Sequence, residues 1–243
     1  MQKKIRKRKE MHYFYTPDIR TRAELPEEEA AHAVRVLRLQ SGDEVMLIDG
    51  QGSFFRATIT TATQKRCLLH IEEEIPQAPV WTGHLHLAMA PTKNMDRNEW
   101  LAEKATEIGW DELSFLNTRY SERRVIKTER IEKILVSAVK QSLKARMPRL
   151  NEMTDFARFI AREDLPTQRY IAHCHEGEKA VLKDVIKHGE DCLVMIGPEG
   201  DFSEEEVALA IEHGFKPISL GRSRLRTETA ALMAVAIMNL ANS

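Results

Sequence analysis

The chain has 243 residues, 42% of them hydrophobic and 30% charged, which is the composition of a globular protein with one large domain or two smaller ones. Its formal net charge of −1 argues against a protein that is basic throughout, and no apolar run is long enough to predict a membrane span. The N-terminus lacks the apolar core of a secretory signal, and three widely spaced cysteines without a CxxC pair indicate free thiols. We therefore expect a cytoplasmic protein that has no membrane partner and no zinc site.

The N-terminal part predicts a small β-rich unit over residues 11–77. Residues 1–10 precede it as a basic extension with six basic groups and one acid. A helix is expected at residues 27–39, and strands at 44–48, 54–60 and 66–72. Asp49-Gly50-Gln51-Gly52 is a strong signal for a hairpin between the first two strands. Pro76 and Pro79 place the domain boundary near residues 76–82.

The remainder alternates between strand and helix patterns, which is typical of an α/β domain with a mainly parallel sheet. Asp96 can cap the first of its helices, and Ser203 with Glu206 forms a capping box at the start of a later one. The predicted strands are 84–90, 113–116, 169–173, 193–196 and 216–220. The predicted helices are 96–108, 128–145, 178–188, 203–213 and 227–241.

The last of these helices is apolar on nearly every side, from Ala230 to Leu240. It is too short to cross a bilayer. A helix that is apolar all round must be buried all round. We therefore expect it either in the middle of the domain or covered by a second subunit.

Two glycine-marked loops follow predicted strands, at Ile196–Phe202 and Leu220–Ala230. Ligands bind at the carboxyl ends of α/β strands, so neighbouring strands would bring the two loops into one composite pocket. The first loop leads into the helix that begins at Ser203, whose N-terminus suits an anionic group; the alternative is an ordinary capped turn.

Arg222, Arg224 and Arg226 in the second loop require either acidic partners, such as Glu228, or an anionic ligand. The P-loop and GxGxxG fingerprints are absent, as are motifs for a catalytic serine or cysteine. The pairs His84 with His86 and His173 with His175 are interpreted as packing or surface residues rather than metal ligands.

Positive charge gathers in residues 119–149, where ten basic residues face three acids. Such a patch on a neutral protein indicates either a polyanion-binding surface or a solvated helix face.

In ordered combination, these motifs resemble a known family over residues 11–243, the SPOUT-class RNA methyltransferases that make 3-methyluridine in 16S ribosomal RNA. The resemblance rests on both glycine loops and on further segments in chain order: Met11 to Tyr15, His32 with Val36-Leu37-Arg38, Gly42-Asp43, Asp49 to Gly52, Lys104 to Gly109, and Gln141-Ser142 with Pro148. The chain departs from the family pattern at Asp201, where a second glycine is common, and at Lys144, where arginine is usual.

The resemblance implies a PUA-like β-barrel over residues 11–77. It also implies a SPOUT methyltransferase domain over 83–243, with a trefoil-knotted parallel sheet and helices on both faces. The cofactor would be S-adenosylmethionine, the partner the 16S rRNA of the small ribosomal subunit, and the protein a homodimer. The alternatives are another SPOUT enzyme, such as a transfer RNA ribose 2′-O methyltransferase, and a non-catalytic RNA-binding assembly factor.

This resemblance implies catalytic, cofactor-binding and RNA-binding roles for three groups of residues. Arg226, Glu199 and Glu228 are the catalytic candidates, with Arg226 stabilising negative charge on the uracil and Arg224 as a second choice for that role. The cofactor-binding candidates are Gly197, Pro198, Glu199, Gly200, Leu220, Gly221, Leu225 and Arg226. The RNA-binding candidates are His32, Arg35, Arg38, Arg123, Arg124, Lys144 and Arg146.

Overall fold

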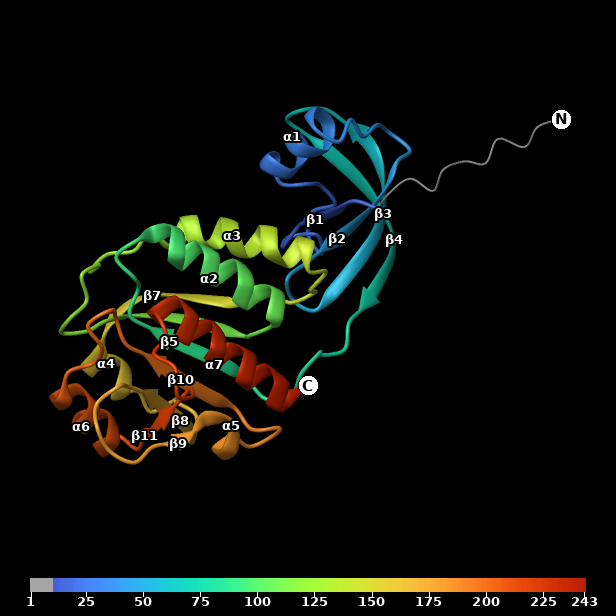
Figure 1. Cartoon of the computed structure of the whole chain (residues 1–243). Coiled ribbons are helices and arrows are strands. Elements are labelled where there is room, and N and C mark those ends of the chain that lie inside the picture. Colours follow the sequence, from blue (N-terminus) through green and yellow to red (C-terminus); the bar gives the residue numbers. More distant parts are fainter. Residues whose placement is uncertain (1–10) are drawn as a thin grey trace. The chain divides into compact units, whose positions relative to one another are not determined.

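The computed structural model describes residues 11–243, so the basic extension at 1–10 lies outside the described residues (Figure 1). The chain divides into two compact units. Unit 1 contains the residues up to Pro79 together with Leu143–Met147, and unit 2 contains Val80–Ser142 and Pro148–Ser243. Within residues 11–243, no helix has the length and apolar character that crossing a membrane requires.

Unit 1 is built on a four-stranded sheet in the order β1-β2-β3-β4, with helix α1 (Glu27–Arg35). Strand β1 pairs parallel with β2, whereas β2, β3 and β4 form an antiparallel meander. The predicted hairpin is confirmed, and Asp49 Oδ1 accepts backbone N–H groups from the next turn residues at 2.8–3.1 Å. The strands are β1 (Tyr13–Tyr15), β2 (Glu44–Ile48), β3 (Ser53–Ala62) and β4 (Cys67–Pro76).

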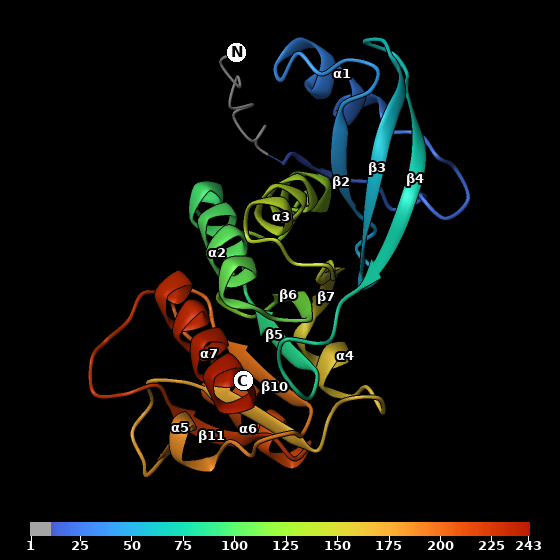
Figure 2. The same ribbon diagram turned by 90° about the vertical axis from the view of Figure 1, so that its right-hand side faces the viewer.

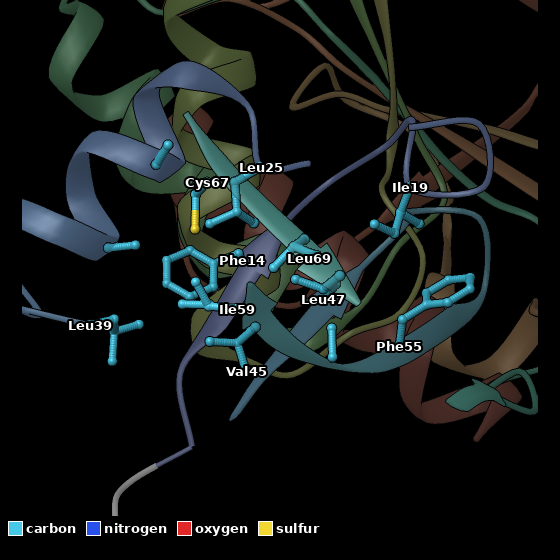
Figure 3. Packing of buried hydrophobic residues seen from close by; sticks show 13 residues of the cluster. Phe14, Ile19, Leu25, Leu39, Val45, Leu47, Phe55, Ile59, Cys67 and Leu69 are labelled. Carbon is cyan, nitrogen blue, oxygen red and sulfur yellow. The ribbon is translucent and has the colours of Figure 1, made fainter. Parts of the chain in front are cut away.

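Alternating residues of these strands bury one face of the sheet against the α1 side, as their period of two requires. Figure 3 shows the resulting core, in which Phe14 of β1 lies among side chains from β2, β3 and β4. Helix α1 ends at Arg35 and is shorter than the predicted 27–39, because Arg38 adopts a left-handed φ of 56° that a helix cannot accommodate. The core residues include Phe14, Leu25, Ala33, Val45, Leu47, Phe55, Ile59 and Leu69.

The segment Leu143–Met147 was predicted to be helical up to residue 145, and that prediction is wrong. Helix α3 (Thr128–Gln141) ends earlier, where Ser142 Oγ donates to the Ala138 carbonyl and Leu143 takes a left-handed φ of 53°. The segment instead bonds to the β2–β3 hairpin: Gly52 N–H donates to the Ala145 carbonyl and Met147 N–H to the Gly50 carbonyl. Helical periodicity could not show this pairing because it is non-local.

Unit 2 is built on a seven-stranded sheet in the order β7-β6-β5-β10-β8-β11-β9, and every pairing in it is parallel. This confirms the predicted α/β class. Five of the strands correspond to predicted ones. The bounds are β5 (Leu85–Met89), β6 (Glu112–Asn117), β7 (Arg149–Asp155), β8 (Gln168–Ala172), β9 (Ala180–Val181), β10 (Cys192–Ile196) and β11 (Lys216–Ser219).

The two edge strands, β7 and β9, were not predicted. Strand β7 carries polar residues and has no fully buried one, so it lacks the apolar run that marks a central strand. The helix predicted at 178–188 is wrong, because Ala180 and Val181 pair with β11 and only Leu182–Val185 (α5) is helical. Edge positions are decided by pairing with a distant strand, which local periodicity does not record.

Helices cover both faces of the unit 2 sheet, as expected. Helices α2 (Met95–Ile108), α3 and α7 (Thr227–Asn242) lie on one face, and α4 (Phe156–Ile160) and α6 (Glu204–Glu212) lie on the other (Figures 1 and 2). The capping box of α6 is confirmed, since Ser203 Oγ accepts the Glu206 N–H and Glu206 accepts the Ser203 N–H. Helix α2 is capped by Asn94 rather than by Asp96.

Helix α7 is buried on one side only. Ala231, Ala234, Val235 and Met238 pack into unit 2, whereas Leu240 is 77% exposed and Met233 41% exposed. The first alternative for this apolar helix, complete burial within the domain, is therefore wrong for the single chain. An uncovered apolar stripe of a helix indicates a surface for another molecule.

Candidate functional site

The two glycine-marked loops line one pocket, as the sequence predicted. The pocket has a volume of about 570 Å³ and opens at the carboxyl ends of three adjacent strands, β10, β8 and β11. The strands that lead into the loops are not neighbours, however, since β8 lies between them. The end of β8 therefore contributes a third wall, formed by Ala172, His173 and Cys174.

The first loop is shaped by close packing at its glycines. A Cβ on Gly197 would lie 2.9 Å from the Phe202 backbone nitrogen, and one on Gly200 would lie 3.1 Å from the Tyr120 Cβ. Pro198 is buried between them. The N-terminus of α6 uses its own Ser203 and Glu206 side chains as caps, so two of its backbone N–H groups are satisfied without a ligand.

Asp201 stands at the position where the sequence pattern described above commonly has a second glycine. It adopts a left-handed φ of 65°, the geometry that glycine takes at least cost. Its carboxylate accepts the Cys174 N–H at 2.6 Å and the Phe202 N–H at 2.8 Å. The side chain thus ties the end of β8 to the first loop, and these charge-assisted hydrogen bonds offset the backbone strain.

In the second loop, Leu220, Gly221, Arg224, Leu225 and Arg226 line the pocket. Gly221 has a φ of +134°, which disfavours any side chain even though a Cβ there would meet open space. All three of the loop's arginines are exposed. Of the two alternatives for these arginines, an ion pair with Glu228 is not formed, because Glu228 pairs with Arg97.

Glu228 instead faces Arg97 of α2, with 3.6 Å between Oε1 and the guanidinium nitrogen. The carboxylate is buried in the first turn of α7, and its Oε2 has no hydrogen-bond partner. The positive end of the helix macrodipole favours a carboxylate at this position. Glu199 is more exposed, and one of its oxygens accepts the Lys93 backbone N–H at 2.9 Å.

Sequence reasoning missed the lining residues outside the two loops, among them Arg97, His173 and Cys174. Arg97 lies on a helix with no ligand motif, so nothing in its local sequence marked it. His173 and Cys174 stand at the end of a predicted strand, which was the available signal once β8 was known to lie between β10 and β11.

The predicted RNA-binding residues lie in both units. In unit 1, His32, Arg35 and Arg38 are exposed, although Arg38 lies beyond the end of α1 and so does not share a helix side with the other two. Lys144 and Arg146 lie on the segment bonded to the β2–β3 hairpin, and Arg146 also donates to the Gln51 carbonyl at 3.2 Å.

In unit 2, Arg123 donates to the carbonyls of Thr92 and Lys93, and Arg124 donates to the Asn117 side chain and the Arg119 carbonyl. Arg124 is exposed and Arg123 half-buried. These contacts hold the loop that follows β6 in place.

His84, which precedes β5, and the buried His86 of β5 belong to one polar network. His84 lies 2.8 Å from a Glu112 oxygen, and His86 bonds to Ser114 at 2.9 Å. Burial lowers the pKa of His86 to about 4, whereas the bond to Glu112 raises the pKa of His84. Over residues 11–243, no group of three or more histidine, cysteine or carboxylate side chains has the geometry of a metal site.

Comparison with known proteins identifies the class of protein to which this fold and this pocket belong. Residues 79–239 match the model of the RNA methyltransferase domain, and residues 25–72 match that of the RNA methyltransferase PUA domain. The chain belongs to this family of RNA methyltransferases, with a SPOUT-like parallel sheet preceded by a PUA-like four-stranded sheet.

Individual relatives are similar over most of their length. The ribosomal RNA small subunit methyltransferase E of Synechocystis sp. is 30% identical over 84% of this chain and 68% of its own. The crystal structure of a probable rRNA-methyltransferase from Porphyromonas gingivalis is 46% identical, with a TM-score of 0.87 over 93% of this chain and 95% of its own. A ribosomal RNA small subunit methyltransferase E from Neisseria gonorrhoeae, bound to S-adenosyl methionine, is 25% identical with a TM-score of 0.81 over 95% and 98%.

Proposed function

We propose that the protein methylates N3 of a uridine in 16S ribosomal RNA of the small subunit, with S-adenosylmethionine as the methyl donor. The observation that carries the proposal is the single pocket into which both glycine-marked loops fold, at the carboxyl edge of β10, β8 and β11. The named activity of the Synechocystis relative and the cofactor bound to the Neisseria relative support it.

The residues of the pocket fit this cofactor. Its volume of about 570 Å³ lies within the range of small-molecule sites. Ile196, Ile218, Leu220 and Leu225 supply apolar walls for a purine, and Glu228 offers a buried, unpartnered carboxylate oxygen to a polar or cationic group. When bound, S-adenosylmethionine supplies a methyl group already activated on a sulfonium.

The protein must then position the target uracil and stabilise the negative charge that develops on it. Uridine N3 carries a weakly acidic proton, and negative charge spreads over the uracil as that proton leaves. Arg226 lies on the pocket wall and makes no side-chain ion pair within residues 11–243, so its guanidinium is available to that charge. We assign Glu228 to orienting the ligand and Glu199 to holding the first loop through Lys93.

The target base must be unpaired or turned out of its stack, because N3 is blocked in a duplex. We propose residues 11–77 as an RNA-holding domain, which would use the exposed His32, Arg35 and Arg38 together with Lys144 and Arg146 on its hairpin-bound segment. Residues 83–243 would form the catalytic domain, in which Arg123 and Arg124 contact phosphates. The trefoil knot of this domain stays a prediction.

We also propose that the protein is a cytoplasmic homodimer. The uncovered apolar stripe of α7, with Met233 and Leu240, supports a second copy as the occupant. Sedimentation of the full chain should give a dimer, and Leu240→Asp should shift it toward monomer. A wild-type protein that sediments as a monomer at micromolar concentration would disprove this part of the proposal.

The decisive experiment incubates the full chain with S-adenosylmethionine and 16S rRNA or small subunits, and then identifies the methylated nucleoside by mass spectrometry. N3-methyluridine supports the proposal, whereas ribose 2′-O methylation would favour the rival SPOUT activity. Absence of both methylation and cofactor binding would favour an RNA-binding factor.

The charge role of Arg226 has a matched control within the same loop. Arg226→Ala should lower the methyl-transfer rate about 100-fold while cofactor affinity, measured by calorimetry, changes less. Arg222→Ala removes an equally exposed arginine that does not line the pocket, and it should keep the wild-type rate. Equal rates in the two variants would show that Arg226 does not stabilise the charge.

A further inference from the structure

His173 stands where three strand ends meet. It directly follows β8, which lies between the strands that lead into the two glycine-marked loops. Its side chain lines the pocket of about 570 Å³ and also a second cavity beside it, of about 650 Å³, between the segment 173–179 and helix α6. It is therefore part of the wall common to both cavities.

The imidazole of His173 has no hydrogen-bond partner. Both ring nitrogens are buried and unsatisfied. The nearest aromatic ring, His175, lies 5.4 Å away between centroids, and its Nε2 is already bonded to the Phe202 carbonyl at 2.7 Å. Leaving buried polar atoms unpaired costs free energy, so a native protein generally has a reason for them, such as a ligand.

The backbone fixes His173 from both sides. On one side, Ala172 pairs with Ile196 and Ile218 within the sheet. On the other, the Cys174 N–H donates to the Asp201 carboxylate. The imidazole is thus presented from a rigid position, as a group that meets a reacting ligand should be.

The surroundings of His173 favour its neutral form. Burial is the largest cause that lowers its pKa, and Lys179 and His175 on its own segment act in the same direction. Asp201, from the loop before α6, acts in the opposite direction. Acidic residues also line the second cavity, namely Glu176, Glu178 and Glu204. A neutral imidazole offers one acceptor nitrogen and one N–H donor.

The other candidate bases that line the pocket are carboxylates, and each of them already has a hydrogen-bond or ion-pair partner. Asp201 holds two backbone N–H groups, Glu199 holds one, and Glu228 faces Arg97. By their ordinary pKa values, a carboxylate is also a weaker base than an imidazole for a proton as weakly acidic as that of uridine N3.

We propose that the side chain of His173 turns from its buried position to contact the target uracil and accepts its N3 proton, an inference that rests on the proposed function. The N3–H bond breaks, its electron pair stays on N3, and the proton forms a new N–H bond at the acceptor nitrogen of His173. The products of this step are an imidazolium and a uracil anion, and the N3 lone pair is then free to take the methyl group. The charge of Arg226 acts on the same anion from the opposite loop.

The test compares His173→Gln with wild type and with His213→Gln. Glutamine can still form hydrogen bonds but cannot take the proton, and His213 lines neither cavity. His173→Gln should lower the single-turnover rate of N3 methylation by about 100-fold or more. It should also lose the wild-type rise in rate as pH increases through the His173 pKa, and added imidazole should partly restore His173→Ala.

A readout independent of turnover comes from NMR of the imidazole signals, with the His173 signal assigned as the one missing from the variant. That signal should titrate below the ordinary pKa of 6.5 and should shift when substrate RNA is added in the presence of S-adenosylhomocysteine. Cofactor affinity should be equal in wild type and His173→Gln, which also shows that the variant is folded.

Three results would overturn the inference: an unchanged rate and pH profile in His173→Gln, a signal that RNA does not move, or a loss of cofactor affinity in the variant, which would assign His173 to the cofactor instead. If wild type makes no N3-methyluridine, the proposed function fails and the role of His173 fails with it. If wild type makes it and His173→Gln makes it equally well, only the role of His173 fails.

Discussion

The buried network around His86 predicts a specific pH dependence of stability. His86 is a β5 residue whose side chain contacts Ser114 of β6 and the Phe159 ring of α4 and is 4% exposed. Burial lowers its pKa from 6.5 to about 4 in the folded protein. Between these two values the unfolded chain binds a proton at His86 and the folded chain does not, so acid destabilises the fold.

The size of this effect follows from linkage. With an unfolded pKa of 6.5 and a folded pKa of about 4, the fold is less stable at pH 5 than at pH 8 by about 2 kcal/mol through His86 alone. The substitution His86→Gln removes the titration, and glutamine can still bond to Ser114, which also receives a hydrogen bond from Asn151. The free energy of unfolding of His86→Gln, relative to that of wild type, should therefore be about 2 kcal/mol greater at pH 5 than at pH 8.

Urea unfolding followed by tryptophan fluorescence measures this difference, because all three tryptophans, at positions 81, 100 and 110, lie in unit 2. His84→Gln is the matched control with the opposite sign. The folded pKa of His84 is raised by Glu112, so its stabilisation is fully present below pH 6.5 and is lost as pH rises through the folded pKa. His84→Gln should thus lose stability in acid relative to wild type. A stability difference between His86→Gln and wild type that is the same at both pH values would refute the reasoning.

Three further predictions concern stability and thiol reactivity. Gly109→Ala should lower the stability of unit 2 by about 2 kcal/mol or more in the same urea assay. The reason is that Gly109 has a φ of +127° and that a Cβ there would lie 2.5 Å from the Trp81 ring. A loss below about 0.5 kcal/mol would contradict this close contact. Ser203→Ala should cost about 1 kcal/mol through the lost α6 capping box, whereas Ser203→Thr should keep most of that stability. A thiol reagent should modify Cys174 in the native protein and all three cysteines only in urea, because Cys174 is exposed and the other two are buried, while burial raises the thiol pKa at all three positions. Reaction of more than one thiol in the native protein would show that the buried sites open.

Local patterns were enough to predict most elements of the fold. The hairpin at Asp49 to Gly52 and the capping box at Ser203 depend on residues within four positions of each other, so their chemistry is readable in order along the chain. Central strands such as β10 are continuous apolar runs because both faces of a parallel sheet are covered. The same reasoning failed for the segment 143–147 and for β9, whose structures depend on hydrogen bonds to distant strands.

The candidate site was predictable in part for the same reason. The two loops were recognisable by glycines and arginines that stand close together in sequence, and the structure brings them into one pocket. Arg97 and His173 were not recognisable, because their importance comes only from what lies next to them. The partner of Glu228 could not be predicted either, since it is Arg97 of α2, which is far away in sequence.

The sequence by itself determined the α/β class and the two glycine-marked loops, because both depend on residues close together in the chain. The PUA-like and methyltransferase parts followed from the family resemblance that these loops and the other motifs carry. Only the tertiary structure decided that β8 separates those loops, that it places an unpartnered imidazole between them, and that Asp201 anchors it. The physical reason is that parallel strands meet through crossover connections, so the side chains at one sheet edge come from positions far apart in the chain.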